Sequence, residues 1–162
     1  MKLSPLFKGI ITAVLMIGFS LIAYYYIPIT SSLHWLVYGI YALGITWTVI
    51  SWNSSPSSTG KFGDSFNAGF RCFIVATFLM TIYSFTFNKM HPEFAEEASK
   101  QYKEQELKVK NTSKTPDQIE AEATRYKNGY VLAKVYGSIF GYLIIGVGVT
   151  AVLSALLTNR RR

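Results

Sequence analysis

Residues 9–60 read GIITAVLMIGFSLIAYYYIPITSSLHWLVYGIYALGITWTVISWNSSPSSTG and contain no Asp, Glu, Lys or Arg over 52 consecutive positions. In a water-soluble domain about a quarter of all residues are charged. Across the 162 residues of this chain, 50% are hydrophobic and only 15% are charged. Half of the chain is enough for four membrane spans, because one span takes about 20 apolar residues. We therefore expect a small integral membrane protein that is embedded in the lipid bilayer.

The composition also excludes two other classes of protein. Cys72 is the only cysteine, so the chain is not a disulfide scaffold. Aromatic residues make up 15% of the chain, which is too many for a disordered protein. For a chain of this kind we expect no nucleic-acid partner.

The apolar positions fall into four segments of membrane-spanning length. These lie at about residues 6–27, 33–52, 66–87 and 130–157, and a solvated stretch at 92–129 separates the last two. The turn at 28–32 is so short that the first two segments must form an antiparallel hairpin. The sequence thus predicts an all-α, polytopic membrane protein, with four transmembrane helices in two hairpins and a short amphipathic helical excursion between spans 3 and 4. We expect one domain over residues 1–162.

The stretch 93–129 differs in composition from the rest of the chain. It holds seven Lys or Arg residues and eight of the nine acidic residues, so we expect it to lie outside the bilayer. Thr115, Pro116 and Gln118 form a capping box with proline at the first helical position, which predicts a short helix from there toward Gly129. Apolar residues recur at helical spacing in the stretch, first at Phe94, Ala98 and Tyr102 and then in a similar stripe at Ile119, Ala123, Tyr126 and Tyr130. Two amphipathic helices can lie on the membrane or the bundle ends, or form a docking surface for a partner.

Lysine and arginine are unevenly distributed among the connections, and this asymmetry sets membrane orientation. The predicted inner segments contain Lys2, Lys8, Lys61, Arg71 and the Arg160–Arg162 tail. The turn at 28–32 contains no basic residue. We therefore expect both termini in the cytoplasm.

Small residues line one face of the first and last spans, and small faces let helix backbones approach each other closely in lipid. The predicted helix-packing residues are Gly9 and Ala13 in the first span and Gly137, Gly141 and Gly148 in the last. Gly146 falls on the opposite face of the last span. The small faces pack either inside the four-helix bundle or at a seam with a second copy or a partner membrane protein.

Ionisable residues are few inside the spans. Asp64 precedes Arg71 by seven residues, or about two helical turns, so the two could form an interfacial ion pair near one membrane surface. Asp64 or Ser65 also suits the N-cap of the third span. Arg71 and Lys134 lie near the ends of their spans, where we expect both to anchor at the interface.

No group of residues indicates a reaction. His34, His91 and Glu93 lack the close ligand spacing of a metal site. Cys72 has no histidine near it in the sequence, so it is not expected to act as a catalytic thiol. We expect no catalytic residue, no metal and no cofactor, and the protein is not expected to be an enzyme.

Four features, in their order along the chain, carry a resemblance to a known family. They are the start MKLSPLFKG at 1–9, FGDSFNAGFR at 62–71, HPEF at 91–94 and a Lys/Glu-rich stretch before a glycine-rich last span. Over nearly its whole length the chain resembles the small four-span membrane proteins of Bacteroidetes-type bacteria that form the domain of unknown function 4199 family. The resemblance implies a bacterial inner-membrane location and supplies no activity. It also implies a gene neighbourhood with polyprenyl-phosphate glycosyltransferases.

Three kinds of function remain open at the level of the sequence. The first is a non-catalytic accessory subunit or anchor of a bacterial envelope-assembly complex, with a polyprenyl-phosphate glycosyltransferase as the first candidate partner. The second is a small oligomeric transporter or lipid-handling membrane protein. The third, an intramembrane enzyme, lacks a nucleophile or an acid/base pair. We favour the first.

Overall fold

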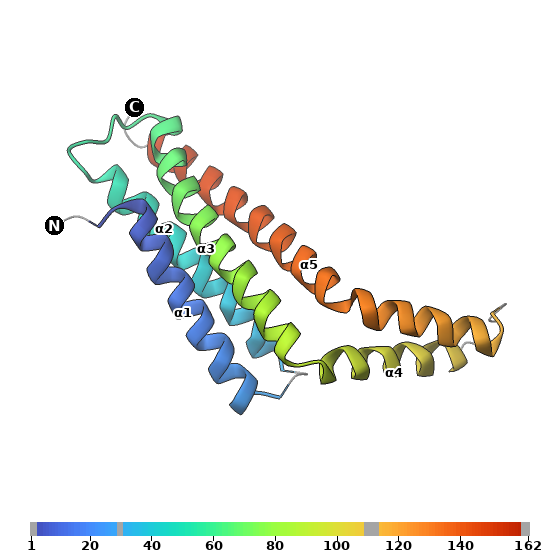
Figure 1. The fold of residues 1–162 in the computed structure, drawn as a ribbon. Helices are drawn as coiled ribbons and strands as arrows, with labels where there is room; N and C mark the ends of the chain where they lie inside the picture. Colours follow the sequence, from blue (N-terminus) through green and yellow to red (C-terminus); the bar gives the residue numbers. More distant parts are fainter. Residues whose placement is uncertain (1–2, 29–30, 109–113, 160–162) are drawn as a thin grey trace. The chain divides into compact units, whose positions relative to one another are not determined.

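The computed structural model of the protein describes residues 3–28, 31–108 and 114–159. These residues form helices and connections without any strand. The elements are α1 (Pro5–Tyr26), the 3-10 helix η1 (Ser32–Trp35), α2 (Leu36–Asn53), α3 (Phe62–Met90), α4 (Glu93–Lys108) and α5 (Pro116–Asn159) (Figure 1). The all-α class predicted from the sequence is confirmed for the part of the chain that is described.

Four segments are long and apolar enough to cross a membrane. They are Pro5–Tyr26, Ser32–Asn53, Phe62–Met90 and Pro116–Thr158. In the most apolar part of each, only 22% to 33% of the residues are buried inside the protein. Most of their apolar surface is therefore available to lipid, as in a multi-pass membrane protein.

Contacts within the chain form two compact units. The first unit consists of residues 1–81 and 139–162, and the second consists of residues 82–138. Helices α3 and α5 each contribute to both units. The single domain over residues 1–162 stays a prediction, since one domain can contain two packed units.

The start and end of α1 follow from its sequence. The Ser4 Oγ accepts a hydrogen bond from Phe7 N at 3.3 Å, and Pro5 occupies the first helical position, where its missing N–H is not needed. Ile27 is extended, so the helix ends at Tyr26. Residues 29 and 30 of the predicted turn lie outside the described residues, as does the Arg160–Arg162 tail.

Helix α3 begins at Phe62, several residues before its predicted start. The Lys61 carbonyl accepts hydrogen bonds from the N–H groups of Asp64 at 3.2 Å and Ser65 at 3.3 Å, which starts the helix early. The Asp64 carboxylate accepts a hydrogen bond from Thr59 N at 2.8 Å, which ties the preceding loop to the first turn. The prediction that Asp64 or Ser65 caps the helix was wrong. Asp64 lies inside the first turn, where its negative charge suits the helix dipole.

The core of the first unit combines apolar and polar side chains. Its fully buried large residues include Tyr41, Phe73, Met16, Ile45 and Val49. The Tyr41 hydroxyl oxygen lies 3.0 Å from Thr77 Oγ1 and donates to the Tyr142 carbonyl at 3.1 Å. These contacts join α2, α3 and α5. In lipid, close packing and hydrogen bonds between helices replace much of the hydrophobic drive, so this cluster is a main link of the unit.

The second unit contains α4 and the first part of α5, which run side by side (Figure 1). The predicted capping box is confirmed, because Thr115 N donates to Gln118 Oε1 at 2.9 Å and Gln118 N donates to Thr115 Oγ1 at 3.3 Å. The expected end near Gly129 was wrong, since α5 continues to Asn159. A glycine inside a helix costs about 1 kcal/mol relative to alanine. That is too little to end a helix whose neighbours on both sides favour it.

Candidate functional site

Small residues bring α4 and α5 together in the second unit. The buried positions of this pair are Ala95 and Ser99 on α4 and Ile119 and Ala123 on α5. The Ser99 hydroxyl donates a hydrogen bond to the Ala123 carbonyl at 2.9 Å, so the side chain of one helix reaches the backbone of the other. We call α4 together with residues 116–128 of α5 the polar hairpin.

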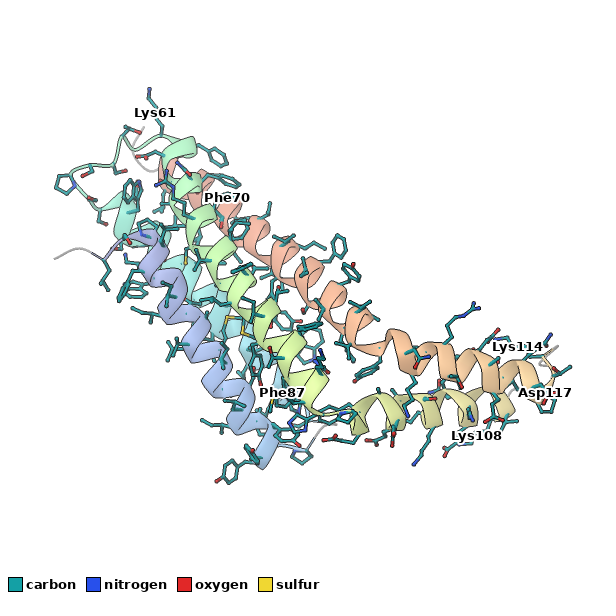
Figure 2. All side chains as sticks on the ribbon, viewed as in Figure 1. Lys61, Phe70, Phe87, Lys108, Lys114 and Asp117 are labelled. Carbon is teal, nitrogen blue, oxygen red and sulfur yellow. The ribbon has the colours of Figure 1, made fainter. Side chains whose placement is uncertain are left out.

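Ion pairs connect the two helices of the polar hairpin. Lys127 Nζ lies 2.8 Å from Glu96 Oε1, and Lys103 Nζ lies 2.9 Å from Glu120 Oε1. As the residue number increases along α4, the number of its partner on α5 decreases, so the two helices are antiparallel. The side chains of these pairs are largely exposed, so dissolved salt screens their attraction. The pairs therefore fix the register of the two helices more than they stabilise the hairpin. Figure 2 shows further charged side chains at the end of the hairpin, including Lys108, Lys114 and Asp117.

A cluster of side chains around Tyr102 links the two helices of the polar hairpin near the connection between them. Lys114 Nζ lies 2.6 Å from Glu122 Oε2 and 3.3 Å from Glu106 Oε1. The Tyr102 hydroxyl donates to Glu122 Oε2 at 2.5 Å, and its ring stacks on Tyr126 with centroids 5.6 Å apart. The hydrogen bond to Glu122 raises the pKa of Lys114 and also raises the pKa of Tyr102. Lys114 therefore remains a cation at every physiological pH.

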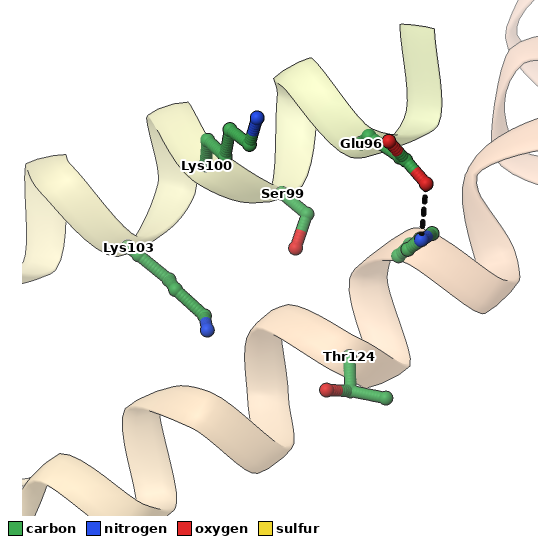
Figure 3. A pocket seen from close by; sticks show the side chains of 6 residues that line it. Glu96, Ser99, Lys100, Lys103 and Thr124 are labelled. Carbon is green, nitrogen blue, oxygen red and sulfur yellow. Dashed lines mark hydrogen bonds and ion pairs between the residues drawn. The ribbon is translucent and has the colours of Figure 1, made fainter. Parts of the chain in front are cut away.

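An open cleft of about 370 Å³ lies between the two helices (Figure 3). It is lined by Glu96, Ser99, Lys100, Lys103, Thr124 and Lys127. Glu96 is paired with Lys127, the dashed contact in Figure 3, and Lys103 is paired with Glu120. Lys100 takes part in none of the ion pairs between described residues. All of the lining side chains are polar or charged.

The predicted packing residues of the first span lie at helix contacts inside the first unit. A Cβ built on Gly9 would lie 2.5 Å from the Cys72 carbonyl oxygen and 3.2 Å from Val75 Cβ, so α1 and α3 touch at this glycine. Ala13 is fully buried. These two positions take part in contacts within the chain.

The glycines of the last span are placed differently from the prediction. Gly148 is exposed, with no atom within 4 Å of a Cβ built on it, and the same holds for Gly137. At Gly141 the nearest atom is the Tyr38 hydroxyl oxygen, at the ordinary contact distance of 3.6 Å. Gly146, placed on the opposite face by the helical wheel, is instead the buried one. A seam with a second copy or a partner at Gly137, Gly141 and Gly148 stays a prediction.

The sequence predicts an ion pair between Asp64 and Arg71. The Asp64 carboxylate accepts hydrogen bonds from both Thr59 N and Thr59 Oγ1, and Arg71 takes part in none of the ion pairs between described residues. The structure shows Asp64 bound to the loop before α3, and an ion pair with Arg71 stays a prediction. The loop before α3 folds back on Asp64, and the seven-residue spacing could not reveal this.

The histidines each have a nearby partner. His91 Nδ1 lies 2.6 Å from Glu93 Oε1, and the pKa of Glu93 is lowered by a backbone hydrogen bond and by His91. His34 Nε2 lies 3.0 Å from the Pro28 carbonyl oxygen. Within residues 3–28, 31–108 and 114–159 no three His, Cys, Asp or Glu side chains are grouped to hold a metal ion.

The sequence reasoning did not identify Ala95 and Ser99 as the contact positions of α4. It selected the neighbouring stripe of Phe94, Ala98 and Tyr102 because of its apolar character. The signal that could have found the contact is the pair of small residues Ala95 and Ser99 at i and i+4 on α4, which face the small residue Ala123 on α5. Small residues mark a close approach of helices more directly than large apolar ones.

Comparisons with known proteins identify the family of the chain. No curated protein and no solved structure matched it. A family model described as "Protein of unknown function (DUF4199)" matches residues 7–159, which is nearly the whole chain. The matched region contains the polar hairpin and all of the apolar helices except the first two residues of α1, and the chain therefore belongs to the DUF4199 family.

Proposed function

We propose that the protein is a non-catalytic integral membrane protein that serves as an accessory subunit or anchor of a bacterial envelope-assembly complex. It resides in the inner membrane with both termini in the cytoplasm, which leaves the polar hairpin on the outer side. The partner is another membrane protein, and a polyprenyl-phosphate glycosyltransferase is the first candidate.

One observation carries this proposal. Helix α5 is a single helix of 44 residues whose first part belongs to the polar hairpin and whose last part is an apolar span. The two parts are joined within one helix, and no non-helical linker lies between residues 116 and 159. A partner bound by the polar hairpin is thus tethered to a span by the same helix, which is what an anchor requires.

The charges of the polar hairpin also support a docking role. Ser99, Ala123 and the ion pairs hold its two helices together, so the outward residues form a preorganised surface. Glu97, Glu104 and Arg125 are exposed on that surface and take part in none of the ion pairs between described residues.

The test is copurification at native abundance. In one variant a short Gly/Ser linker replaces residues 93–127, and in a second Glu97, Glu104 and Arg125 are all changed to Ser. We expect both variants to insert into the membrane and to lose at least one copurifying membrane protein. The matched control changes Ser54 and Ser57, exposed in the loop before α3, to Ala and retains the partner. Identical sets of copurifying proteins for wild type and both variants would contradict the proposal.

The second candidate, a small oligomeric transporter or lipid-handling protein, is favoured by a different observation. Gly148 and Ala155 are exposed one above the other on α5, where a second helix backbone could approach closely. Crosslinking in native membranes separates the two candidates. Products that contain only copies of this chain favour the oligomer and contradict the accessory-subunit proposal.

A further inference from the structure

A second cleft lies at one end of the first unit, where α1 begins, α2 ends and α3 begins. Its volume is about 410 Å³. Its lining includes Ser4 and Lys8 from the start of α1, Ser51 and Ser55 from the end of α2 and the following loop, and Arg71 from α3. Among the described residues, no Asp or Glu lines the cleft.

Lys8 is the unusual residue of this cleft. It is only 5% exposed, although lysine is almost never fully buried without a partner of opposite charge. No ion pair between described residues involves Lys8, and its Nζ lies over the Trp47 ring at 4.9 Å. A ring face compensates only part of what an ammonium group loses when it leaves water. The site thus holds a buried cation that has no anionic partner among the residues that the structure describes.

The other lining groups complement Lys8. Arg71 adds a guanidinium that pairs with no carboxylate among the described residues, and a guanidinium matches two oxygens of a phosphate at once. Ser51 and Ser55 each add a hydroxyl that can donate a hydrogen bond. The first turn of α1, capped by Ser4, adds the positive end of a helix dipole. All of these groups favour a negative charge in the cleft.

We propose that this cleft binds a phosphate group, through Lys8 and Arg71 with hydrogen bonds from Ser51 and Ser55. Two positive charges and several donors match a tetrahedral anion with several acceptor oxygens. The cleft lies at the ends of helices that can span a membrane, which is the depth of lipid headgroups. The phosphate can come from a lipid headgroup or from free phosphate in solution. The site is independent of the accessory-subunit role, since no residue of the polar hairpin takes part.

Native mass spectrometry of the purified full chain in detergent tests the proposal. The probes are phosphatidic acid, diacylglycerol with the same acyl chains, and inorganic phosphate. Phosphatidic acid and diacylglycerol differ only in the phosphate, so we expect the first to bind and the second not to bind. Inorganic phosphate that displaces phosphatidic acid and binds alone identifies a site for free phosphate. Phosphatidic acid that resists inorganic phosphate identifies a lipid site.

The variants are Lys8→Met, Arg71→Gln and Ser51→Ala, with Lys61→Gln as the control. Lys61 is exposed near the same end of the unit and points away from the helices (Figure 2). We expect Lys8→Met and Arg71→Gln to weaken phosphate binding at least about tenfold, which corresponds to the loss of one charge-assisted contact. Ser51→Ala should weaken it about threefold, and Lys61→Gln should leave it unchanged.

A second readout keeps the proposal testable without a ligand. Methionine has a length similar to that of lysine and no charge, so Lys8→Met should melt at a higher temperature than wild type in phosphate-free detergent. Added phosphatidic acid should raise the melting temperature of wild type and not that of Lys8→Met. Equal binding of phosphatidic acid and diacylglycerol, or unchanged binding in both Lys8→Met and Arg71→Gln, would overturn the proposal.

Discussion

A Cβ built on Gly146 would lie 2.7 Å from the Tyr41 hydroxyl oxygen, well inside contact distance. Phe73 is equally close, with its Cγ at 2.8 Å. Helix α5 can therefore approach α2 and α3 only because position 146 carries no side chain. The Tyr41 hydroxyl, which donates to the Tyr142 carbonyl, depends on this approach.

The variant Gly146→Leu should destabilise the protein more than Gly148→Leu. Overpacking a close contact typically costs about 1–3 kcal/mol, whereas Gly148 has free space around it. Thermal unfolding of both variants in the same detergent measures the difference. Similar melting temperatures would show that Gly146 is not at a close helix contact. A lower melting temperature for Gly148→Leu would show that the last span packs through Gly148 instead.

Removing the Tyr41 hydroxyl tests the polar link between the helices. Tyr41→Phe keeps the ring and loses the contacts with Thr77 Oγ1 and the Tyr142 carbonyl. We expect a loss of roughly 0.6 kcal/mol for the coupling with Thr77, the typical value between helices in a membrane. A double-mutant cycle of Tyr41→Phe and Thr77→Val measures it. Thr46→Val is the control, because the Thr46 hydroxyl bonds only within its own helix. A coupling energy of zero would show that the two hydroxyls act independently.

A larger side chain should disrupt the contact between α4 and α5 at Ala123 but not at Ala121. Ala123 is fully buried against Ser99, so Ala123→Leu should separate the helices and cost about 1–3 kcal/mol. Ala121 is exposed, and Ala121→Leu should have little effect. Amide hydrogen exchange of residues 93–108 reports on the hairpin. Equal exchange rates in the two variants would mean that α4 does not pack on α5 through Ala123.

The polar hairpin should loosen in acid. The hydrogen bond from Lys127 lowers the pKa of Glu96 below its usual value of 4.5. A carboxyl group whose pKa is lower in the folded state stabilises the fold at pH values above its unfolded-state pKa. This stabilisation is lost as the pH falls through the folded-state pKa. Protection of α4 amides, corrected for intrinsic exchange, should therefore fall as the pH drops below 4.5. Glu96→Gln should weaken this pH dependence, and Glu104→Gln should retain it. Identical profiles for all three proteins would exclude the Glu96–Lys127 pair as the cause.

Orientation is tested with single cysteines in a Cys72→Ser background. Gln101 lies on the exposed surface of α4 and Ser57 in the exposed loop before α3. With both termini in the cytoplasm, Gln101→Cys should react with an impermeant maleimide in intact spheroplasts and Ser57→Cys should not. Both should react after the membrane is permeabilised. The reverse pattern in intact cells would invert the proposed topology.

Hydropathy and local signals were sufficient for the helical class, the four apolar segments and the capping box at Thr115 and Gln118. Each depends on residues close together in the chain, so their physics is local. The same local reasoning predicted that the helix starting near Pro116 ends at Gly129, because it treated the low helix propensity of glycine as a helix end. The favourable neighbours on both sides outweigh a cost of about 1 kcal/mol.

Tertiary structure alone decided which small residues face a neighbour. A helical wheel separates Gly146 from Gly148 but cannot say which of the two meets Tyr41, because lipid and protein interior are both apolar and leave similar patterns in the sequence. The partner of Asp64 was decided in the same way, since Thr59 reaches it only through the fold of the loop. The buried Lys8 also belongs here. Its position in the sequence is that of an ordinary flanking lysine, and only the packing of three helix ends encloses its charge.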